Sequence, residues 1–339
     1  MAAKMRLREA VRRALHDEMA ADPSVILLGE DLAAAGGAFK VTEGLLDAYG
    51  EKRVKDTPIS EEAFLGAAVG AAATGLRPVV EMMFVEFIGV GLDQLTTQAA
   101  KLRYLSRGTA TAPLVVRATA GAGLGFGCQH SQILDGWFRG VPGLKLVIPS
   151  DAQAAYGLLR AAIRDDDPVV FLEHKALYAS RSEVVTGEEG VLELGKARTM
   201  QTGTDVTVVT SGLTVGIAMK AAGMDESPSM EVIDLQTLAP WDRDAVLESV
   251  ARTGRIATVE EGPFSAGWGT EIVSEVAVAM HGKLAAPPLR ITSPDVPVPY
   301  AGALEARYVP TPALVAGQLA EFVSTGESVP AWWTKEVPA

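Results

Sequence analysis

Hydrophobic residues in the first half of the chain form short, nearly continuous runs that alternate with segments of helical periodicity. Runs of this kind are typical of strands buried on both faces of a parallel sheet. We expect strands at residues 25–28, 77–83, 113–117, 144–148 and 169–172. We expect helices at residues 1–22, from residue 61 onward, at 91–105 and at 152–163. The alternation predicts an α/β domain built on a mainly parallel sheet.

The second half repeats this alternation on a smaller scale. Apolar runs predict strands at residues 206–209, 230–235, 255–259 and 289–292, with helices at 215–222, 243–250 and 270–280. The intervening residues 180–198 are polar and less periodic. We therefore predict two domains, residues 1–185 and 199–339, joined by a linker at 186–198. The second domain is expected to be a smaller α/β unit with a mainly parallel sheet.

The stretch from Asp56 to Phe64 combines several helix-start features. Pro58 disfavours helix at Thr57, Ser60 is a good N-cap, and two carboxylates occupy the first turn. Glu61 is therefore expected at the rim of a helix. The following small residues, 65–75, suit a buried helix pressed against other backbone. A well-capped packing helix and a functional carboxylate are both compatible with this stretch.

Composition and charge exclude several classes of function. The 339 residues are 48% hydrophobic and 21% charged, with a net charge of −12 and no Lys/Arg cluster, so nucleic acid is not an expected partner. No apolar run reaches membrane-spanning length. Cys128 is the only cysteine, which is typical of a reducing compartment. We expect a cytoplasmic protein that is not bound to a membrane.

Residues 121–132 join a glycine-rich segment to the sequence Gln-His-Ser-Gln. The glycine spacing does not fit a dinucleotide fingerprint, and no Walker A sequence occurs, so a turned loop is favoured over a phosphate cradle. His130 follows the end of a predicted strand, where α/β sheets place their ligands. It is a candidate for proton transfer, and a structural hydrogen bond is the alternative.

Other catalytic classes find little support. There is no G-x-S-x-G elbow for a Ser/His/Asp hydrolase, and the four histidines are scattered rather than clustered for metal binding. The run Asp165–Asp167 reads either as a solvated turn or as oxygen ligands for a hard cation.

Several ordered stretches match a known family. The chain resembles, over nearly its whole length, the β subunit of the thiamine-diphosphate-dependent E1 component of 2-oxo acid and acetoin dehydrogenase complexes. The matching stretches are residues 29–31, 56–61, 75–78, 93–94, 99–101, 129–132, 142–145, 164–165, 167–168, 231–235 and 259–262. The resemblance implies a transketolase-like pyrimidine-binding domain followed by a transketolase C-terminal domain.

The resemblance also implies roles for individual residues. In this family a glutamate bonds the pyrimidine ring nitrogen of the cofactor and thereby helps to generate the ylid nucleophile; Glu61 matches it. His130 matches a histidine at the active-site mouth, implicated in proton handling and in acylation of the lipoyl group. Other positions that match the cofactor pocket are Phe87, which stacks on the pyrimidine, and Glu30, Ile59 and Met83. Some members hold potassium at the positions of Leu114, Ala162, Asp165 and Asp167.

Asparagine is absent from the chain. Thiamine-diphosphate enzymes usually hold Mg²⁺ and diphosphate with a G-D-G motif and a following asparagine, and neither occurs here. The resemblance therefore implies that an α subunit holds Mg²⁺, in an α2β2 assembly that transfers acyl groups to a lipoyl-bearing E2. The same absence argues against a stand-alone transketolase-like enzyme.

Substrate choice is open within the family. Residues 79–87, 173–178 and 297–300 look closest to acetoin dehydrogenase subunits, with pyruvate and then branched-chain 2-oxo acid subunits as alternatives. A scaffold subunit and a pathway-specific acyl or acyloin transferase subunit are further alternatives. Many relatives have a second histidine where this chain has Gly140, and alanine is common where it has Cys128.

Overall fold

The computed structural model describes residues 2–334, which divide into two compact units. The first comprises residues up to 121 together with 137–194, and the second comprises 122–136 together with the chain from 195 onward. The segment 122–136, which carries His130, thus packs with the second unit. The predicted boundaries at 185 and 199 and the linker at 186–198 stay predictions.

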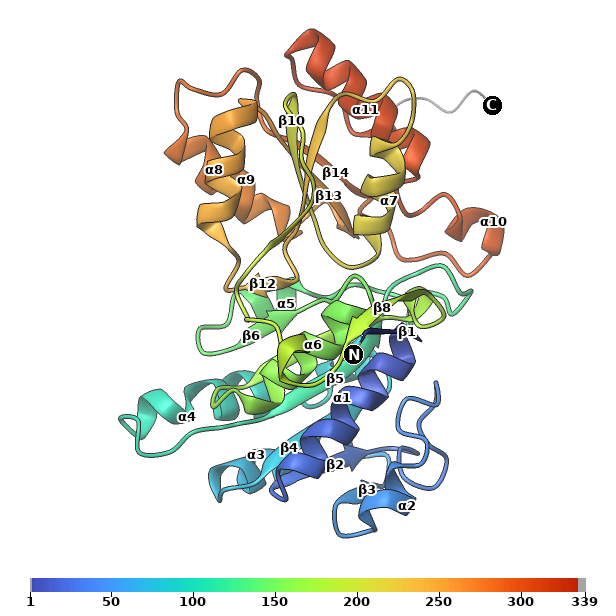
Figure 1. The fold of residues 1–339 in the computed structure, drawn as a ribbon, viewed down its shortest axis with the longest axis vertical. Coiled ribbons are helices and arrows are strands. Elements are labelled where there is room, and N and C mark those ends of the chain that lie inside the picture. Colours follow the sequence, from blue (N-terminus) through green and yellow to red (C-terminus); the bar gives the residue numbers. More distant parts are fainter. Residues whose placement is uncertain (1, 335–339) are drawn as a thin grey trace. The chain divides into compact units, whose positions relative to one another are not determined.

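The first unit is built on a parallel sheet, as the apolar runs predict (Figure 1). Its strands lie in the order β6 (Lys145–Val147), β7 (Val169–His174), β5 (Val115–Ala120), β4 (Arg77–Met82), β2 (Val25–Gly29) and β3 (Val54–Asp56). β3 was not predicted, because it has only three residues and two of them are exposed and charged. A separate antiparallel pair joins β1 (Ala2–Arg6) to β8 (Arg181–Val185).

Helices cover this sheet. α1 (Leu7–Ala21) and α6 (Ala152–Arg164) lie side by side, and α3 (Glu61–Ala73) packs on β4 and β2. Shorter segments are α2 (Leu45–Tyr49), α4 (Ala100–Leu105), α5 (Gly136–Arg139), the 3₁₀ turns η1 (Val85–Gly89), η3 (Lys175–Leu177) and η4 (Glu188–Gly190), and the π-helix η2 (Gln94–Ala99).

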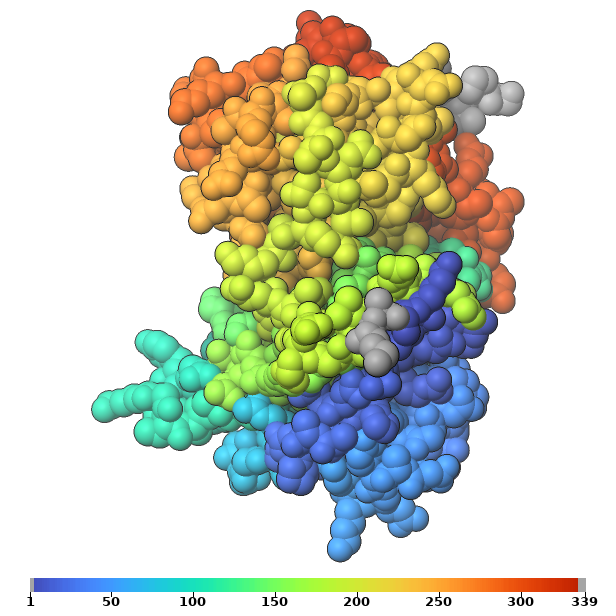
Figure 2. Space-filling view, in the orientation of Figure 1, coloured from blue at the N-terminus to red at the C-terminus, as the bar shows by residue number. Residues whose placement is uncertain are grey.

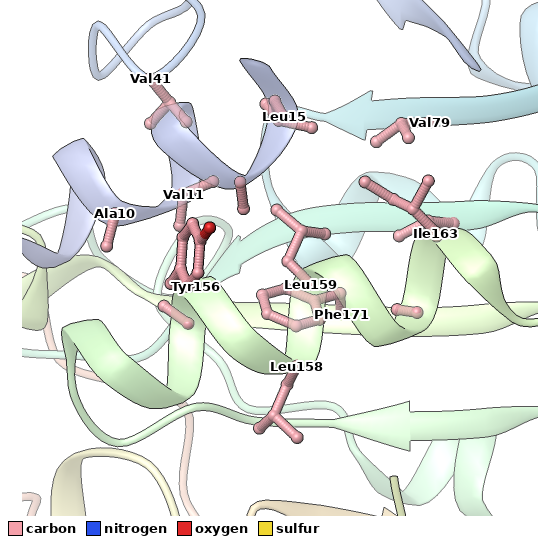
Figure 3. Packing of buried hydrophobic residues seen from close by; sticks show 14 of the residues in the cluster. Ala10, Val11, Leu15, Val41, Val79, Tyr156, Leu158, Leu159, Ile163 and Phe171 are labelled. Atoms are coloured by element: carbon pink, nitrogen blue, oxygen red, sulfur yellow. The ribbon is translucent and has the colours of Figure 1, made fainter. Parts of the chain in front are cut away.

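Figure 3 shows the core between α1, α6 and the sheet. Val11 and Leu15 of α1 face Tyr156 and Leu159 of α6, and Phe171 of β7 lies beneath them; all are fully buried. Because successive strand residues point to opposite faces, alternate positions of each strand supply this core. The other positions face the side of the sheet that α3 covers.

Four expectations for the first unit are wrong in detail. The N-terminal helix begins at Leu7 instead of residue 1, because residues 2–6 pair with β8. Ser60 makes no side-chain cap: its hydroxyl donates to the Pro58 carbonyl at 3.2 Å. The helix at 91–105 is a π-helix followed by a short α-helix. In this chain α3 buries only one side, and Ala63, Ala67 and Gly70 are exposed.

The second unit has the predicted smaller α/β architecture. Its sheet runs in the order β14 (Leu289–Ser293), β13 (Ile256–Pro263), β10 (Val206–Thr210), β11 (Met230–Asp234) and β9 (Arg198–Gln201), and only β9 is antiparallel to its neighbour. The remaining elements are α7 (Leu213–Ala222), β12 (Thr237–Ala239), α8 (Arg243–Thr253), α9 (Gly269–Ala279), α10 (Gly302–Glu305), α11 (Pro312–Thr325) and η5 (Trp332–Thr334).

The C-terminal indole of Trp332 docks on the second unit, as a tryptophan on a tail is expected to do. Its Nε1 donates to the Thr292 carbonyl at 2.8 Å, and its ring packs on the core of that unit. Within residues 2–334, no helix combines the length and the hydropathy that crossing a membrane requires.

Candidate active site

The first unit brings several predicted site residues to one edge of its sheet. Glu30 follows β2, Thr57 follows β3 and Met83 follows β4 closely. These strands are parallel, and Gly29 lies in register with both Asp56 and Glu81. The residues that follow the strands therefore emerge at the same carboxyl edge, which is where open α/β sheets place their ligands.

Glu61 is the first residue of α3 and stands at this edge. The turn before it is fixed by the Thr57 backbone N–H, which donates to the Gly29 carbonyl at 3.0 Å. The Ser60 backbone N–H donates to the carboxyl group of Glu30. A helix N-terminus favours negative charge, so the position suits the carboxylate of Glu61.

Glu30 lies in an electrostatically unfavourable position. Burial raises its pKa, and the negative charges of Glu61 and Asp31 raise it further, while the Ser60 N–H opposes the rise. Its Oε1 atom is buried and has no hydrogen-bond partner within the described chain. The Thr57 Oγ1 atom is in the same condition. Buried polar atoms normally have partners, so these two point to a polar ligand.

A surface hollow of about 540 Å³ adjoins the start of α3. Its lining residues are Ser60, Glu61, Glu62, Ala63, Gly66, Val90 and Gln94. Two glycines allow the close approach of chain segments here. A Cβ on Gly91 would lie 3.2 Å from the Glu61 carbonyl, and a Cβ on Gly66 would lie 3.0 Å from Gln94 Oε1. Gln94 lies in a stretch that matches the family but was not predicted as a site residue, and Val90 was not predicted either.

The apolar candidates differ in exposure. Ile59 is 84% exposed, whereas Met83 and Phe87 are half-buried. The Phe87 ring lies edge-on to Phe84 at 5.7 Å between centroids, which fixes its position in η1. The Met83 carbonyl accepts a hydrogen bond from Thr119 Oγ1 at 2.5 Å.

His130 belongs to the second unit. It is half-buried in a turn, and its backbone N–H donates to the Gly127 carbonyl at 3.3 Å. Gln132 Nε2 donates to the Cys128 carbonyl at 2.9 Å. The glycines at 121, 123, 125 and 127 all have positive φ, so the segment is tightly turned, as expected.

The residues matched to a potassium site lie at the end of α6 and in the neighbouring loops. The Leu114 carbonyl accepts from the Val169 N–H at 2.9 Å, and the Ala162 carbonyl accepts from the Asp165 N–H at 3.3 Å. Asp165 pairs with Lys145 and Asp167 pairs with Arg103, each at 2.5 Å. Among the described residues, no group of three or more His, Cys, Asp or Glu side chains is arranged to hold a metal.

A buried ionic network lies on the same sheet and was not foreseen. Arg117, 2% exposed, donates from Nε to Glu173 Oε1 at 2.7 Å and from Nη1 to Glu81 Oε2 at 2.8 Å. Tyr178 donates to Glu173 Oε2 at 2.8 Å. Burial raises the pKa of Glu81, and the Arg117 charge opposes this rise. The one sequence signal for this network is the presence of charged residues within the otherwise apolar runs of the predicted strands.

Comparisons with known proteins place the chain in a family. Residues 3–181 match the transketolase pyrimidine-binding domain, and residues 195–315 match the transketolase C-terminal domain. A split-gene transketolase described as an inactive β4 tetramer has a TM-score of 0.77 and 23% identity, covering 95% of this chain and 98% of that one. That structure supports the fold.

Three relatives are closer in sequence. The chain is 43% identical over 339 residues to the β subunit of acetoin:2,6-dichlorophenolindophenol oxidoreductase from Cupriavidus necator, covering 96% of this chain and 100% of that one. It is 46% identical to the pyruvate dehydrogenase E1 β subunit of Rhizobium meliloti (92% and 68% covered). It is 40% identical to the 2-oxoisovalerate dehydrogenase β subunit of Bacillus subtilis (93% and 98% covered). The chain therefore belongs to the E1 β subunits of the 2-oxo acid and acetoin dehydrogenase complexes, a transketolase-like family of oxidoreductases.

Proposed function

We propose that this chain holds the pyrimidine half of thiamine diphosphate and that Glu61 exchanges a proton with the pyrimidine ring nitrogen. The family depends on thiamine diphosphate, and its β subunits work with an α subunit. The observation that carries the assignment to Glu61 is its position at the first turn of α3, where it lines the hollow and its charge acts on the carboxyl group of Glu30.

The described residues fit a polar aromatic ring. The hollow is lined by the carboxylates of Glu61 and Glu62, by the Gln94 amide and by smaller side chains that leave room for a planar group. The unpartnered Glu30 Oε1 and Thr57 Oγ1 atoms supply hydrogen-bonding capacity at the same edge of the sheet. A bound aminopyrimidine offers ring nitrogens and an amino group, which are suitable partners for such oxygens.

Each candidate residue has a distinct part in this mechanism. When bound, thiamine diphosphate supplies a carbon nucleophile for the carbonyl group of the substrate. The Glu61 carboxyl group holds the proton that it shares with the ring nitrogen. Phe87 would stack on the ring, Ile59 and Met83 would line the pocket, and Glu30 would bind the polar edge of the ring. His130 is assigned to proton transfer and to acyl transfer to the lipoyl group.

The partner is an α subunit that supplies the Mg²⁺ and diphosphate half of the site, in an α2β2 heterotetramer. This chain contains neither asparagine nor a G-D-G motif, which supports the assignment of Mg²⁺ and diphosphate binding to the α subunit. Large apolar side chains on the first unit support an association surface: Tyr104 is 85% exposed and Leu105 is 73% exposed. They lie on α4, whose segment stands out from the first unit at the left of Figure 2.

Acetoin is the favoured substrate, with a lipoyl-bearing E2 as the acyl acceptor. The stretches at 79–87, 173–178 and 297–300 support acetoin, and the C. necator relative aligns over its whole length. Relatives named for pyruvate and 2-oxoisovalerate have comparable identity, so these 2-oxo acids are the alternatives. We place the reaction in the cytoplasm and assign the potassium positions to Leu114, Ala162, Asp165 and Asp167.

Co-expression with an α-subunit candidate tests this proposal, namely a chain encoded by an adjacent gene that carries the G-D-G motif and a downstream asparagine. We expect reduction of 2,6-dichlorophenolindophenol to require both chains, Mg²⁺ and thiamine diphosphate. Acetoin, pyruvate and branched 2-oxo acids are compared, and the highest kcat/KM identifies the substrate. A well-assembled, cofactor-bound heterotetramer that turns over none of them would contradict the proposal and favour a scaffold subunit or a subunit that uses another acyl donor.

A further inference from the structure

Two buried carboxylates of the second unit hold the backbone of the glycine segment that leads to His130. Glu305 at the end of α10 is 6% exposed, and Glu261 of β13 is 7% exposed. Neither belongs to the predicted site. We propose that Glu305 is a positioning residue for His130, an inference that rests on the proposed role of that histidine.

The contact is bidentate and directed at the backbone. The Gly123 N–H donates to Glu305 Oε1 at 2.8 Å, and the Gly125 N–H donates to Oε2 at 2.9 Å. One residue earlier, the Ala122 N–H donates to Glu261 Oε1 at 2.7 Å. Hydrogen bonds to an ionised carboxylate are about twice as strong as neutral ones. Three N–H groups within four residues are therefore held by two carboxylates.

These hydrogen bonds define the path of a segment that has no regular secondary structure of its own. Residues 121–135 contain neither helix nor strand, and Gly123 and Gly125 adopt positive φ values of 100° and 74°. Glycine is flexible in the absence of restraints, so the conformation depends on the groups that the backbone contacts. Glu305 is the side chain that restrains both glycines.

The restraint continues toward His130. A Cβ on Gly127 would lie 2.9 Å from the Tyr300 ring, so the segment passes directly against that side chain. The Gly127 carbonyl then accepts the His130 backbone N–H at 3.3 Å. A change in how Gly125 is held is thus transmitted through two residues to the turn that carries the imidazole. Displacing a catalytic group by about 1 Å is enough to slow a reaction roughly 100-fold.

The effect of Glu305→Gln can be worked out from the geometry. The glutamine amide keeps one acceptor oxygen, but its NH₂ group would face a backbone N–H, so one of the two hydrogen bonds is lost. Glu305→Asp keeps both acceptor oxygens on a shorter side chain and should restore part of the restraint. Glu248→Gln, at an exposed position on α8, makes the same change of charge without touching the segment.

The test uses the α/β holoenzyme carrying each variant. We expect Glu305→Gln to speed hydrogen exchange in peptides covering residues 121–135, with unchanged exchange in β10 and β13. kcat should fall roughly 10- to 100-fold, with little change in KM, and Glu305→Asp should fall between wild type and Glu305→Gln. His130→Ala is first measured in a dye assay and in a lipoyl-acceptor assay, and the assay that it slows is used. In that assay, adding Glu305→Gln to His130→Ala should lower kcat little below that of His130→Ala alone.

Several outcomes would overturn the inference. Unchanged exchange in Glu305→Gln would mean that Glu305 does not hold the segment. Faster exchange with normal kcat, or a loss additive with that of His130→Ala, would mean that it does not position His130. A fully active His130→Ala holoenzyme would remove the positioning role, whereas the effect of Glu61→Gln would still report separately on the cofactor site.

Discussion

Burial raises the pKa of Glu30 and the charge of Glu61 raises it further, so the two carboxyl groups at the edge of the first sheet are electrostatically coupled. Burial makes the larger contribution to this shift, and Asp31 adds to it. Groups whose pKa values are shifted by burial together with a specific neighbouring charge are frequent at functional sites. The coupling therefore fits a pair of acids that share a polar ligand.

This coupling predicts a pH-dependent gain in stability for Glu30→Gln. Because the folded pKa of Glu30 lies above its ordinary value of 4.5, protonation stabilises the native state, and that stability is lost as the pH rises through the raised pKa. The neutral glutamine should therefore raise Tm above that of wild type at pH 8 and leave it unchanged at pH 4. Thermal unfolding without cofactor is the measurement, with the exposed Glu51→Gln as control. A lower Tm at both pH values would contradict this explanation.

The buried network predicts a large loss of stability for Arg117→Met. The substitution would leave the carboxylates of Glu81 and Glu173 buried without their cation, which costs about 3–5 kcal/mol. Because the pKa of Glu81 would rise further, the loss should be smaller at low pH, where that carboxyl group is protonated. Urea unfolding measures both effects.

A surface ion pair provides the matched control for this prediction. Arg243 and Glu275 lie 2.6 Å apart on the exposed faces of α8 and α9. Arg243→Met should cost about 0–1 kcal/mol. Equal losses of unfolding free energy for Arg117→Met and Arg243→Met would contradict the prediction that leaving Glu81 and Glu173 without their cation is costly.

Packing around Gly121 predicts that this position does not tolerate alanine. A Cβ there would lie 2.0 Å from His174 Nε2, at a φ of 91°. Gly44 has a similar φ of 82° but nothing within 4 Å of the Cβ position. Gly121→Ala should therefore cost about 1–3 kcal/mol more than Gly44→Ala. Similar midpoints in urea would indicate that His174 moves aside freely.

The proposed potassium site predicts an ion-specific stabilisation of the holoenzyme. Lys145 and Arg103 already pair with Asp165 and Asp167, so a cation there would depend largely on backbone carbonyls. Replacing NaCl by KCl at constant ionic strength should raise Tm, and Asp165→Asn should reduce that difference. Identical Tm values in the two salts would rule out the assignment.

Much of the fold could be predicted because the strands of the two sheets are buried and apolar. Short apolar runs in the sequence mark the strands β2, β4, β5 and β7, and such runs are typical of buried strands. β1 and β8 were missed because they form a separate two-stranded pair, where the apolar pattern is weak. The predicted side-chain cap at Ser60 is wrong because the Ser60 hydroxyl donates to the Pro58 carbonyl instead of accepting from the first turn of α3.

The candidate site could be predicted only where its residues are local in sequence. Glu61 begins a helix whose start is visible in the local sequence, so its place at a helix rim could be predicted from the residues themselves. Glu30 became a candidate only through its match to the cofactor pocket of the resembled family. Glu305 lies 182 residues from Gly123, and no local pattern connects the two. Contacts of this kind depend on how the second unit packs, which periodicity does not reveal.

If Glu61 is the proton partner of the cofactor, its replacement should slow the reaction far more than the same change at an exposed glutamate outside the hollow. Glu51 is such a residue: it is exposed and does not line the hollow beside α3. We would measure dye reduction by α/β holoenzymes carrying Glu61→Gln or Glu51→Gln, at saturating Mg²⁺ and thiamine diphosphate. We expect a loss of at least about 100-fold for Glu61→Gln and a near-normal rate for Glu51→Gln. A Glu61→Gln holoenzyme that reduces the dye at the wild-type rate would contradict it.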